Sequence, residues 1–387
     1  MITHCVIGLG YGDEGKGATT DSLVRQSRRP LVVRFSGGHQ AGHTVIGEDG
    51  RPHVFSNFGA GSLAGAATFW SRHCTFHPVG YANERRALED RGLDPLLIAD
   101  GRCPVTTPYD LLYNRNRETK LRHGSCGLGF GATVARHASP HKLHVLDLLD
   151  DFVLRQKLRS VALYYEKLGA TFDAPVLERA LADFHAANET VRRSLRVTDA
   201  RSFFWDLPYD TIIFEGSQGV LLDQEFGYFP HVTRAHTTSR NAFALCRVYG
   251  LLEPQVHYVT RCYQTRHGNG PLTNEDLPGP KLRDTPEETN VYNPWQGHQR
   301  RTLLDVDQLR YALACDSHYA GTARREVVVT CLDQLKWPWR VTEHGRVIEL
   351  AGTEHLSELL QLPVRRSGAR LPVASAYDSR VGAPPPG

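Results

Sequence analysis

A glycine-rich run directly after the first apolar segment constrains this chain most. Residues 10–17 read Gly-Tyr-Gly-Asp-Glu-Gly-Lys-Gly and lie between a predicted strand at Cys5–Leu9 and a predicted helix at Ala18–Gln26. The run contains the dinucleotide fingerprint G-x-G-x-x-G, but that fingerprint needs an acidic residue near the end of the second strand. The second strand ends in Val33-Arg-Phe-Ser36 and supplies none.

The same run also fits a phosphate-binding loop. Two of its glycines and Lys16 have the spacing at which backbone N–H groups and a lysine hold phosphates, although Gly17 stands where that motif has the Ser or Thr that binds Mg²⁺. Asp13 and Glu14 lie in this loop, and a carboxylate beside polyphosphate is repulsive unless a cation bridges it or it takes part in chemistry. We therefore expect Asp13 to bind Mg²⁺, to act as a base, or to do both. The alternative is a strand–helix turn with solvated acidic side chains, which leaves the glycines and the lysine without a purpose.

A second glycine-rich loop follows the second strand and reads Ser36-Gly-Gly-His-Gln-Ala-Gly-His-Thr44. Its glycines let the backbone approach a ligand closely. Its two histidines supply groups that exchange protons near neutral pH. Two such loops favour a nucleotide site, the alternative being a turn with incidental histidines.

Apolar runs alternate with longer amphipathic segments, which predicts an α/β fold with a mainly parallel sheet flanked by helices. The clearest predicted strands are Cys5–Leu9, Leu31–Phe35, Thr211–Phe214, His257–Thr260 and Val327–Thr330. The predicted helices are Ala18–Gln26, His144–Leu168, Val176–Leu195, Val306–Cys315 and His355–Leu360. We expect one domain over residues 1–381, a flexible tail over 382–387, and a long functional loop over 267–300.

Composition narrows the function classes. The 45 Lys and Arg against 42 Asp and Glu give a net charge of +3, which argues against a nucleic-acid binder. No stretch approaches the roughly 20 apolar residues that span a bilayer, and the N-terminus lacks the features of a signal peptide. The 8 scattered cysteines indicate free thiols in a reducing compartment. We expect a cytoplasmic protein that binds no membrane.

Six segments in order resemble the motifs of adenylosuccinate synthetase, a ligase that joins aspartate to a 6-oxopurine nucleotide with GTP. The first two loops are similar to its W-G-D-E-G-K-G and G-G-x-N-A-G-H-T motifs. The other four are similar to F-E-G-A-Q-G-x-L-L-D, Y-P-x-V-T…T-T, T-R-V-G-x-G-P and T-K-L-D, and they are Phe214–Asp223, Tyr228–Thr238, Thr265–Pro271 and Thr330–Asp333. The resemblance covers about residues 4–335 and implies a P-loop-NTPase-like sheet, Mg²⁺ and a homodimer.

The resemblance also implies the roles of single residues. Asp13 would take the proton from N1 of the purine and bind Mg²⁺, and Gln218 would hold O6, which then attacks the γ-phosphate. His43 would donate to the leaving group, Lys16 would neutralise phosphate charge, and Gly42 would give Mg²⁺ a carbonyl oxygen. The expected nucleoside triphosphate contacts are Gly12, Glu14, Gly15, Lys16, Gly17, Gly42, Thr44, Cys331 and Asp333. The expected purine monophosphate contacts are Asp13, Gln40, Cys126, Arg136, Gln218 and Thr238, with Arg136 reaching across the dimer interface.

The chain departs from the family pattern at several of these positions. Gln40 replaces an Asn, and Cys126 replaces a Thr, which is a stronger hydrogen-bond donor. In the amino-acid loop, His298 stands where a carboxylate-binding Arg is expected, and Arg300 remains. In the base motif, Asp333 is kept but Cys331 replaces a Lys, which makes ATP as well as GTP a plausible donor.

These departures leave the substrate open. IMP and dGMP are both candidates, because the divergent branch N6-succino-2-amino-2′-deoxyadenylate synthase uses dGMP and ATP; in that branch a Ser often replaces the catalytic Asp, whereas Asp13 is present here. A paralogous ligase of nucleoside-antibiotic biosynthesis is one alternative. A non-catalytic nucleotide-binding regulatory protein is another, although a switch needs no base for the purine N1.

Overall fold

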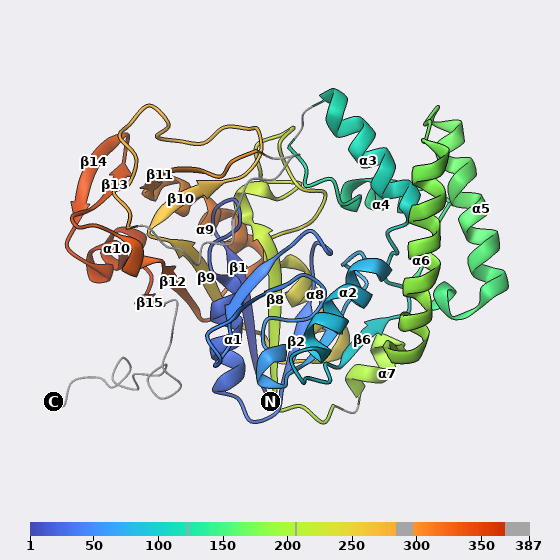
Figure 1. The fold of residues 1–387 in the computed structure, drawn as a ribbon. Helices are drawn as coiled ribbons and strands as arrows, with labels where there is room; N and C mark the ends of the chain where they lie inside the picture. The colour runs from blue at the N-terminus through green and yellow to red at the C-terminus, as the bar shows by residue number, and fades with distance from the viewer. Residues whose placement is uncertain (122–123, 206, 284–296, 368–387) are drawn as a thin grey trace.

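The computed structural model describes residues 1–121, 124–205, 207–283 and 297–367. Its centre is a nine-stranded sheet in the order β15-β12-β9-β1-β8-β2-β5-β6-β7 (Figure 1). All neighbouring strands in it are parallel, which confirms the predicted fold class. The strands are β1 (Ile2–Gly8), β2 (Pro30–Arg34), β5 (Ala67–Trp70), β6 (Leu97–Asp100), β7 (Arg196–Thr198), β8 (Thr211–Gly219), β9 (Gln255–Arg261), β12 (Arg325–Thr330) and β15 (Val364–Arg366).

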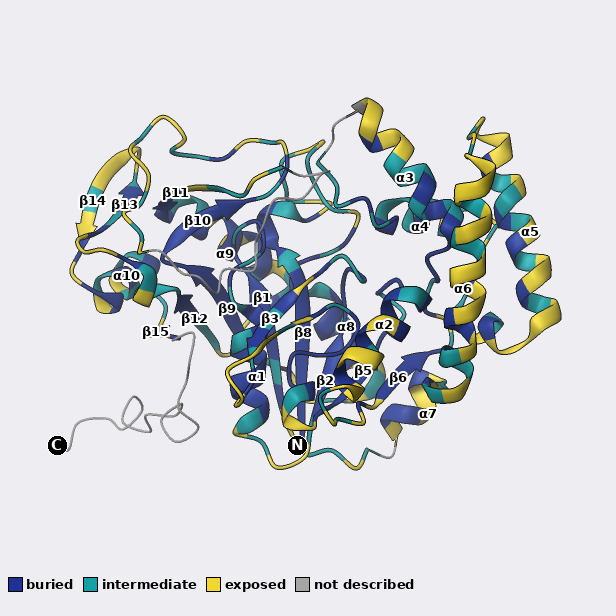
Figure 2. Cartoon of the chain, in the orientation of Figure 1, coloured by how far each residue is buried: buried dark blue, intermediate teal, exposed yellow. Residues whose placement is uncertain are grey.

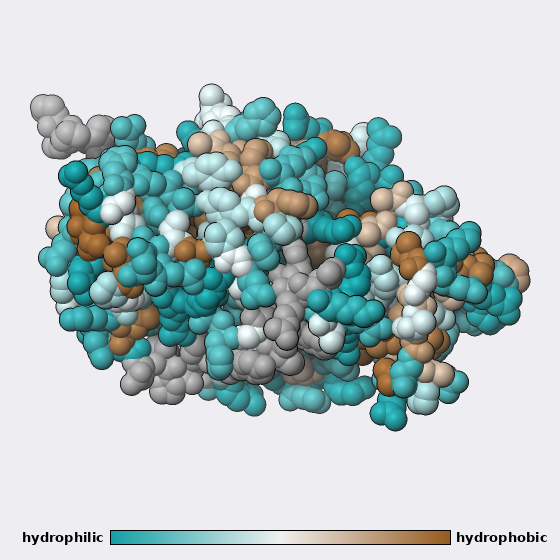
Figure 3. Space-filling model, turned by 90° about the horizontal axis from the view of Figure 1, so that it is seen from above, coloured by the Kyte–Doolittle hydropathy of each residue, from teal (hydrophilic) through white to brown (hydrophobic). Residues whose placement is uncertain are grey.

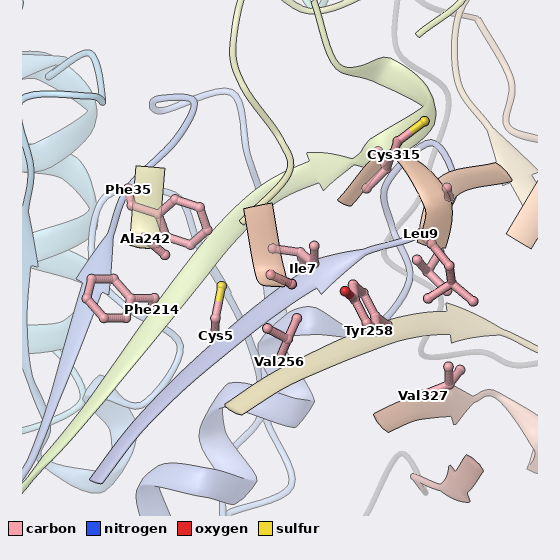
Figure 4. Close-up of a cluster of buried hydrophobic side chains, with 14 of the residues drawn as sticks. Cys5, Ile7, Leu9, Phe35, Phe214, Ala242, Val256, Tyr258, Cys315 and Val327 are labelled. Carbon is pink, nitrogen blue, oxygen red and sulfur yellow. The ribbon is translucent and has the colours of Figure 1, made fainter. Parts of the chain in front are cut away.

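The central strands are apolar on both sides, because helices cover both faces of a parallel sheet. The helices are α1 (Lys16–Arg25), α2 (Pro78–Glu89), α3 (Pro108–Leu121), α4 (Phe130–His137), α5 (Asp151–Lys167), α6 (Ala174–Ser194), α7 (Ala200–Trp205), α8 (Arg240–Tyr249), α9 (Val306–Ala320) and α10 (Thr353–Leu360). Leu23 and Val24 of α1 pack on one face, against Val6, Val32 and Ile213. The alternate residues point to the other face, where α8 and α9 cover them, and Cys5, Ile7, Phe214, Val256 and Tyr258 are among them (Figure 4).

A second core joins the β5–β6 end of the sheet to helices α2, α5 and α6. Trp70, Leu97 and Phe184 are buried in it. The outer surfaces of α5 and α6 are largely exposed (Figure 2). None of the described helices is long and apolar enough to cross a bilayer.

A second sheet of four strands lies beside the β12 side of the main sheet, at the left in Figure 1, in the order β10-β11-β13-β14. Its strands are β10 (Tyr263–Arg266), β11 (Arg300–Asp305), β13 (Trp339–Glu343) and β14 (Arg346–Leu350). A short hairpin of β3 (His43–Ile46) and β4 (Pro52–Phe55) follows the second glycine-rich loop. None of these strands was among those that the sequence predicted.

The five predicted strands and most predicted helices are confirmed within a few residues. The helix predicted at His144–Leu168 is instead a 3₁₀ turn at Val145–Leu149 followed by α5, because Asp150 is extended and caps α5 by accepting the N–H of Val153. The predicted loop over 267–300 contains no helix or strand between 267 and 283, although Arg300 begins β11. Residues 284–296 and the predicted tail lie outside the described residues, and the single domain stays a proposal.

Four side chains on neighbouring strands form a chain of polar contacts on one face of the sheet. His4 Nδ1 lies 2.9 Å from His257 Nε2, and His257 Nδ1 lies 2.6 Å from Glu326, which also accepts a bond from Arg365. Burial and the neighbouring His257 lower the pKa of His4 to about 4. Burial also lowers the pKa of His257, although Glu326 opposes that shift.

Because the pKa values of these histidines are lowered, we expect the folded protein to lose stability in acid. An unfolded histidine takes up a proton as the pH falls below about 6.5, whereas folded His4 resists protonation until about pH 4. The free energy of unfolding is therefore unaffected by this histidine above about pH 6.5, and it decreases as the pH falls from about 6.5 to about 4. The shift is equivalent to about 3 kcal/mol at most. We expect the free energy of urea unfolding to fall less between pH 7 and pH 5 in His4→Asn than in the wild type. His318→Asn, at an exposed histidine, serves as the control, and an equal fall in all three proteins would contradict the assignment.

Candidate active site

The loops predicted to bind nucleotide meet at one edge of the main sheet. They follow β1, β2, β8 and β12, whose carboxyl ends lie together because the strands are parallel, and this edge is where open α/β sheets bind ligands. Seen from above, this side of the molecule is mainly hydrophilic (Figure 3). The site therefore suits a polar ligand.

The first loop is folded around a buried carboxylate. Glu14 is 3% exposed and accepts the backbone N–H of Gly10, while its other oxygen lies 3.7 Å from Lys16 Nζ. Burial raises the pKa of Glu14 to about 7, although Lys16 and the Gly10 N–H oppose the shift. A Cβ at Gly8 would lie 1.8 Å from the Glu14 carboxylate, so this glycine makes room for it. The Glu14 side chain thus shapes the loop from inside.

Lys16 begins α1 and follows Gly15, which has φ 95°, a value that favours glycine. The first turn of α1 carries no acidic residue. Its unpaired N–H groups and the helix dipole favour an anion at this end. At Gly17, a Cβ would lie 2.9 Å from the Cβ of His43, so a Ser or Thr here would push the second loop away.

His43 is anchored by a buried carboxylate that sequence analysis did not assign. His43 is 5% exposed, and its Nδ1 lies 2.7 Å from Oε1 of Glu215 on β8. The other oxygen of Glu215 lies 3.6 Å from Arg34, whose guanidinium is fully buried beside the Trp70 ring. Burial lowers the pKa of His43 against the opposing charge of Glu215. The contact fixes the orientation of the ring and leaves Nε2 as its ligand-side nitrogen.

Asp13 lies at the tip of the first loop with φ 56°, a left-handed conformation that Asp and Asn tolerate better than most residues. Its Oδ2 lies 3.0 Å from His267 Nε2, and its side chain is 29% exposed. Burial would raise the pKa of Asp13, but the hydrogen bond and charge of His267, with Arg261 and Lys16, lower it. Asp13 is therefore ionised near neutral pH, as a base or a metal ligand must be.

Five predicted nucleotide residues hold buried polar atoms that have no hydrogen-bond partner among the described residues. They are Oε2 of Glu14, both amide atoms of Gln40, Nε2 of His43, Oε1 of Gln218 and Oγ1 of Thr238. Buried polar atoms in folded proteins are almost always paired. Gln218 also has φ 47° and packs against Gly12, so a strained residue joins the two loops. These atoms indicate a place for a polar ligand.

The remaining predicted triphosphate residues lie around the same edge. Gly42 is exposed, and Thr44 lies next to His43 on β3. Cys331 has φ 60° and caps a 3₁₀ turn that contains the exposed Asp333. Thr330, just before them, donates from its hydroxyl to the carbonyl of Glu14 at 2.7 Å, which ties the base motif to the phosphate loop.

The loop that carries Cys126 reaches the site from the helical side. A Cβ at Gly124 would lie 2.7 Å from the backbone nitrogen of Asn269, so the two segments are in contact. Burial raises the pKa of Cys126 to about 11, and its thiol is therefore neutral. A neutral thiol is a weak donor, as the sequence led us to expect.

The prediction that Arg136 contacts a neighbouring subunit's nucleotide stays a prediction. The guanidinium of Arg136 is fully buried and donates to both oxygens of Asp110, at 2.9 Å each, and to the carbonyls of Val105 and His141. Within the chain, the bonds to Asp110 join α4 to α3.

Arg300 is also occupied by the chain itself. Its guanidinium donates to the carbonyls of Gly268 and Gly270 at 2.9 and 2.8 Å and pairs with Glu275 at 2.7 Å. An amino-acid carboxylate would have to replace Glu275 there. His298 lies nearby in sequence and is exposed.

Sequence analysis missed Glu215 and His267, the two residues that contact the predicted acid–base pair. Both lie inside motifs that the analysis quoted. The signal for His267 was a histidine where the similar motif has a Val, and the signal for Glu215 was a charged residue at the end of an apolar strand.

Comparison with known proteins identifies the family. A model of the adenylosuccinate synthetase family matches residues 5–341. The adenylosuccinate synthetase of Thermus thermophilus is 29% identical over 373 residues, which cover 92% of this chain and 88% of the relative. That of Mannheimia succiniciproducens is 31% identical over 347 residues, which cover 86% and 78%.

Two solved structures share the fold. The fully ligated adenylosuccinate synthetase of Plasmodium falciparum has a TM-score of 0.75 at 18% identity, covering 94% of this chain and 96% of that one. The succinoaminodeoxyadenylate synthetase of cyanophage S-2L, bound to dGMP and dATP, has a TM-score of 0.62 at 16% identity, covering 94% and 90%. The chain belongs to the adenylosuccinate synthetase family, whose members are ligases that form C–N bonds.

Proposed function

We propose that the protein joins L-aspartate to C6 of a 6-oxopurine nucleotide, IMP or dGMP, through a 6-phosphoryl intermediate formed with GTP or ATP. The product would be adenylosuccinate or its 2-amino-2′-deoxy analogue. The observation that carries the proposal is the set of unpaired buried atoms on Gln40, His43, Gln218 and Thr238, in loops at the same edge of the sheet as an ionised Asp13. A purine monophosphate supplies partners for such atoms, because its N–H and hydroxyl groups donate hydrogen bonds and its base and phosphate oxygens accept them.

The first step needs a base and a holder for the purine. Asp13 accepts the proton from N1, and the electron pair moves to O6, which forms a bond to the γ-phosphorus as the bond to the bridging oxygen breaks. Gln218 lies against Gly12, one residue before Asp13, so its amide holds O6 beside the base. The aspartate amine then displaces phosphate at C6.

His43 and Lys16 act on the leaving nucleotide. Glu215 holds His43 through Nδ1, and a polyphosphate beside the ring favours its protonated form, which donates from Nε2. Lys16 and the amino end of α1 offset the phosphate charge. This is phosphoryl transfer by positioning and electrostatics.

Magnesium fits the donors at this site. Asp13 offers an ionised carboxylate and the exposed Gly42 offers a carbonyl, and Mg²⁺ prefers oxygen ligands. We propose that these two residues hold the ion. When bound, it would neutralise phosphate charge.

A homodimer is part of the proposal through the family resemblance, and the role expected of Arg136 at its interface stays a prediction. A paralogous ligase acting on a modified nucleotide is the second candidate, favoured by the occupied Arg300 and by His298 in the amino-acid loop. A regulatory nucleotide binder is disfavoured by the ionised Asp13.

The proposal is tested by a matrix assay. IMP, dIMP, GMP and dGMP are each combined with ATP or GTP and with aspartate, and phosphate release and product mass are measured. We expect one or more purines to give the N6-succinyl product. Phosphate release without that product would contradict aspartate ligation, and binding without turnover in any combination would favour the regulatory alternative.

Donor selectivity is expected to be relaxed. Asp333 keeps the carboxylate that accepts N–H groups of guanine, but Cys331 offers little packing surface and no charge where similar proteins have a Lys. A pocket change of this size alters discrimination by about 1–3 kcal/mol. We expect ATP to be used, and GTP to be preferred by less than about 100-fold.

Competition between the two donors at saturating purine monophosphate and aspartate measures this preference. Cys331→Lys should shift it toward GTP, whereas Ala182→Lys, at an exposed position of α6, is the control. A strong GTP preference in the wild type would show that another residue replaces the missing Lys.

A further inference from the structure

His267 contacts the predicted catalytic base directly. Its Nε2 lies 3.0 Å from Oδ2 of Asp13, and its side chain is 17% exposed. His267 directly follows β10. The family motif T-R-V-G-x-G-P has an apolar Val at this position. A hydrogen-bonding side chain thus replaces one that cannot hydrogen-bond.

The segment from Arg261 to His267 contacts Gly12 and Asp13 at three points. Arg261, at the end of β9, donates from Nε to the backbone carbonyl of Asp13. Thr265, in β10, donates to the carbonyl of Gly12 at 3.4 Å. His267 adds the contact to the Asp13 side chain. The first two contacts fix the backbone of the loop tip, and the third fixes the carboxylate.

We propose that His267 is a positioning residue, which holds one carboxylate oxygen of Asp13 so that the other faces N1 of the purine. The inference rests on the proposed function, because it takes Asp13 to be the base. It assigns no chemistry to His267 itself. A neutral imidazole with hydrogen on Nε2 makes this contact, so its protonation state does not decide the role. Without the contact, Asp13 would rotate about its side-chain bonds, and a misplacement of about 1 Å can cost 100-fold in rate.

Three substitutions separate positioning from other roles. His267→Val removes the hydrogen bond and gives the residue of the family motif. His267→Gln restores an N–H near the position of Nε2, whereas His267→Asn keeps the polarity but is too short to reach Oδ2. We expect kcat to fall about 10–100-fold in His267→Val and His267→Asn, KM values to change less than about 3-fold, and His267→Gln to recover most of kcat.

The control is His141→Val, which removes a partly buried histidine with one side-chain hydrogen bond, to Ser160 at 2.8 Å, outside the site. Its kcat should match the wild type. Thermal unfolding of all four variants shows whether each remains folded; if His267→Val does not, the comparison of Gln with Asn decides the question.

The inference is overturned if His267→Val or His267→Asn turns over like the wild type, if Gln and Asn are equally slow, or if KM rises while kcat is unchanged. The proposed function fails separately, through a wild-type enzyme that forms no N6-succinyl product or an Asp13→Asn variant that keeps full activity.

Discussion

Asp13→Asn should lower kcat by about 10³-fold or more, because an amide cannot accept the proton from the purine N1. The fold should survive. Asp13 has φ 56°, and Asn adopts the left-handed region as readily as Asp, so the loop keeps its backbone. Alanine would be a poorer test, since it would add backbone strain to the loss of the carboxylate.

The measurement is single-turnover formation of product at saturating substrates, with a thermal unfolding curve for each protein. Asp183→Asn, at an exposed aspartate on α6, is the matched control and should be fully active. A rate near that of the wild type in Asp13→Asn would rule out Asp13 as the base. A slow variant that also unfolds at lower temperature would instead indicate that the carboxylate holds the loop.

The central strands could be predicted because both faces of a parallel sheet are buried. Strands such as β1, β8 and β12 therefore contain continuous apolar runs, which a single sequence displays clearly. Strands β10 and β11 were missed because their pairing depends on partners far along the chain, whereas β13 and β14 form a local hairpin that the sequence analysis overlooked. Leu304 of β11, for example, pairs in parallel with Val341 of β13.

The candidate site likewise contains residues that the sequence predicted and residues that it did not. The residues of the glycine-rich loops were predicted because the loops follow strands of one sheet, so parallel topology alone brings them together. Glu215 and His267 were missed because their roles depend on a contact with a residue elsewhere in the chain, as Glu215 contacts His43. Such contacts have no local pattern.

Arg136, which the motif predicts as a ligand of the purine monophosphate, forms a buried ion pair within its own chain. Its partner Asp110 is fully buried and accepts five hydrogen bonds, two from Arg136, two from Thr107 and one from the hydroxyl of Tyr165 at 2.6 Å. We expect Asp110→Ala to reduce the free energy of urea unfolding by about 3–5 kcal/mol, because it leaves the Arg136 cation buried without its counter-charge.

A double substitution distinguishes a buried ion pair from a nucleotide ligand. If the loss in Asp110→Ala arises from the stranded cation, then also replacing Arg136 by Met should recover part of the stability, since an apolar side chain is no longer penalised by burial. The exposed pair of Asp151 and Arg192 is the control, and Asp151→Ala should cost less than about 1 kcal/mol. If Arg136 instead bound a phosphate, Arg136→Met would raise the KM of the purine monophosphate and leave stability unchanged. Because the guanidinium is fully buried and donates to both oxygens of Asp110, we expect Arg136→Met to change stability.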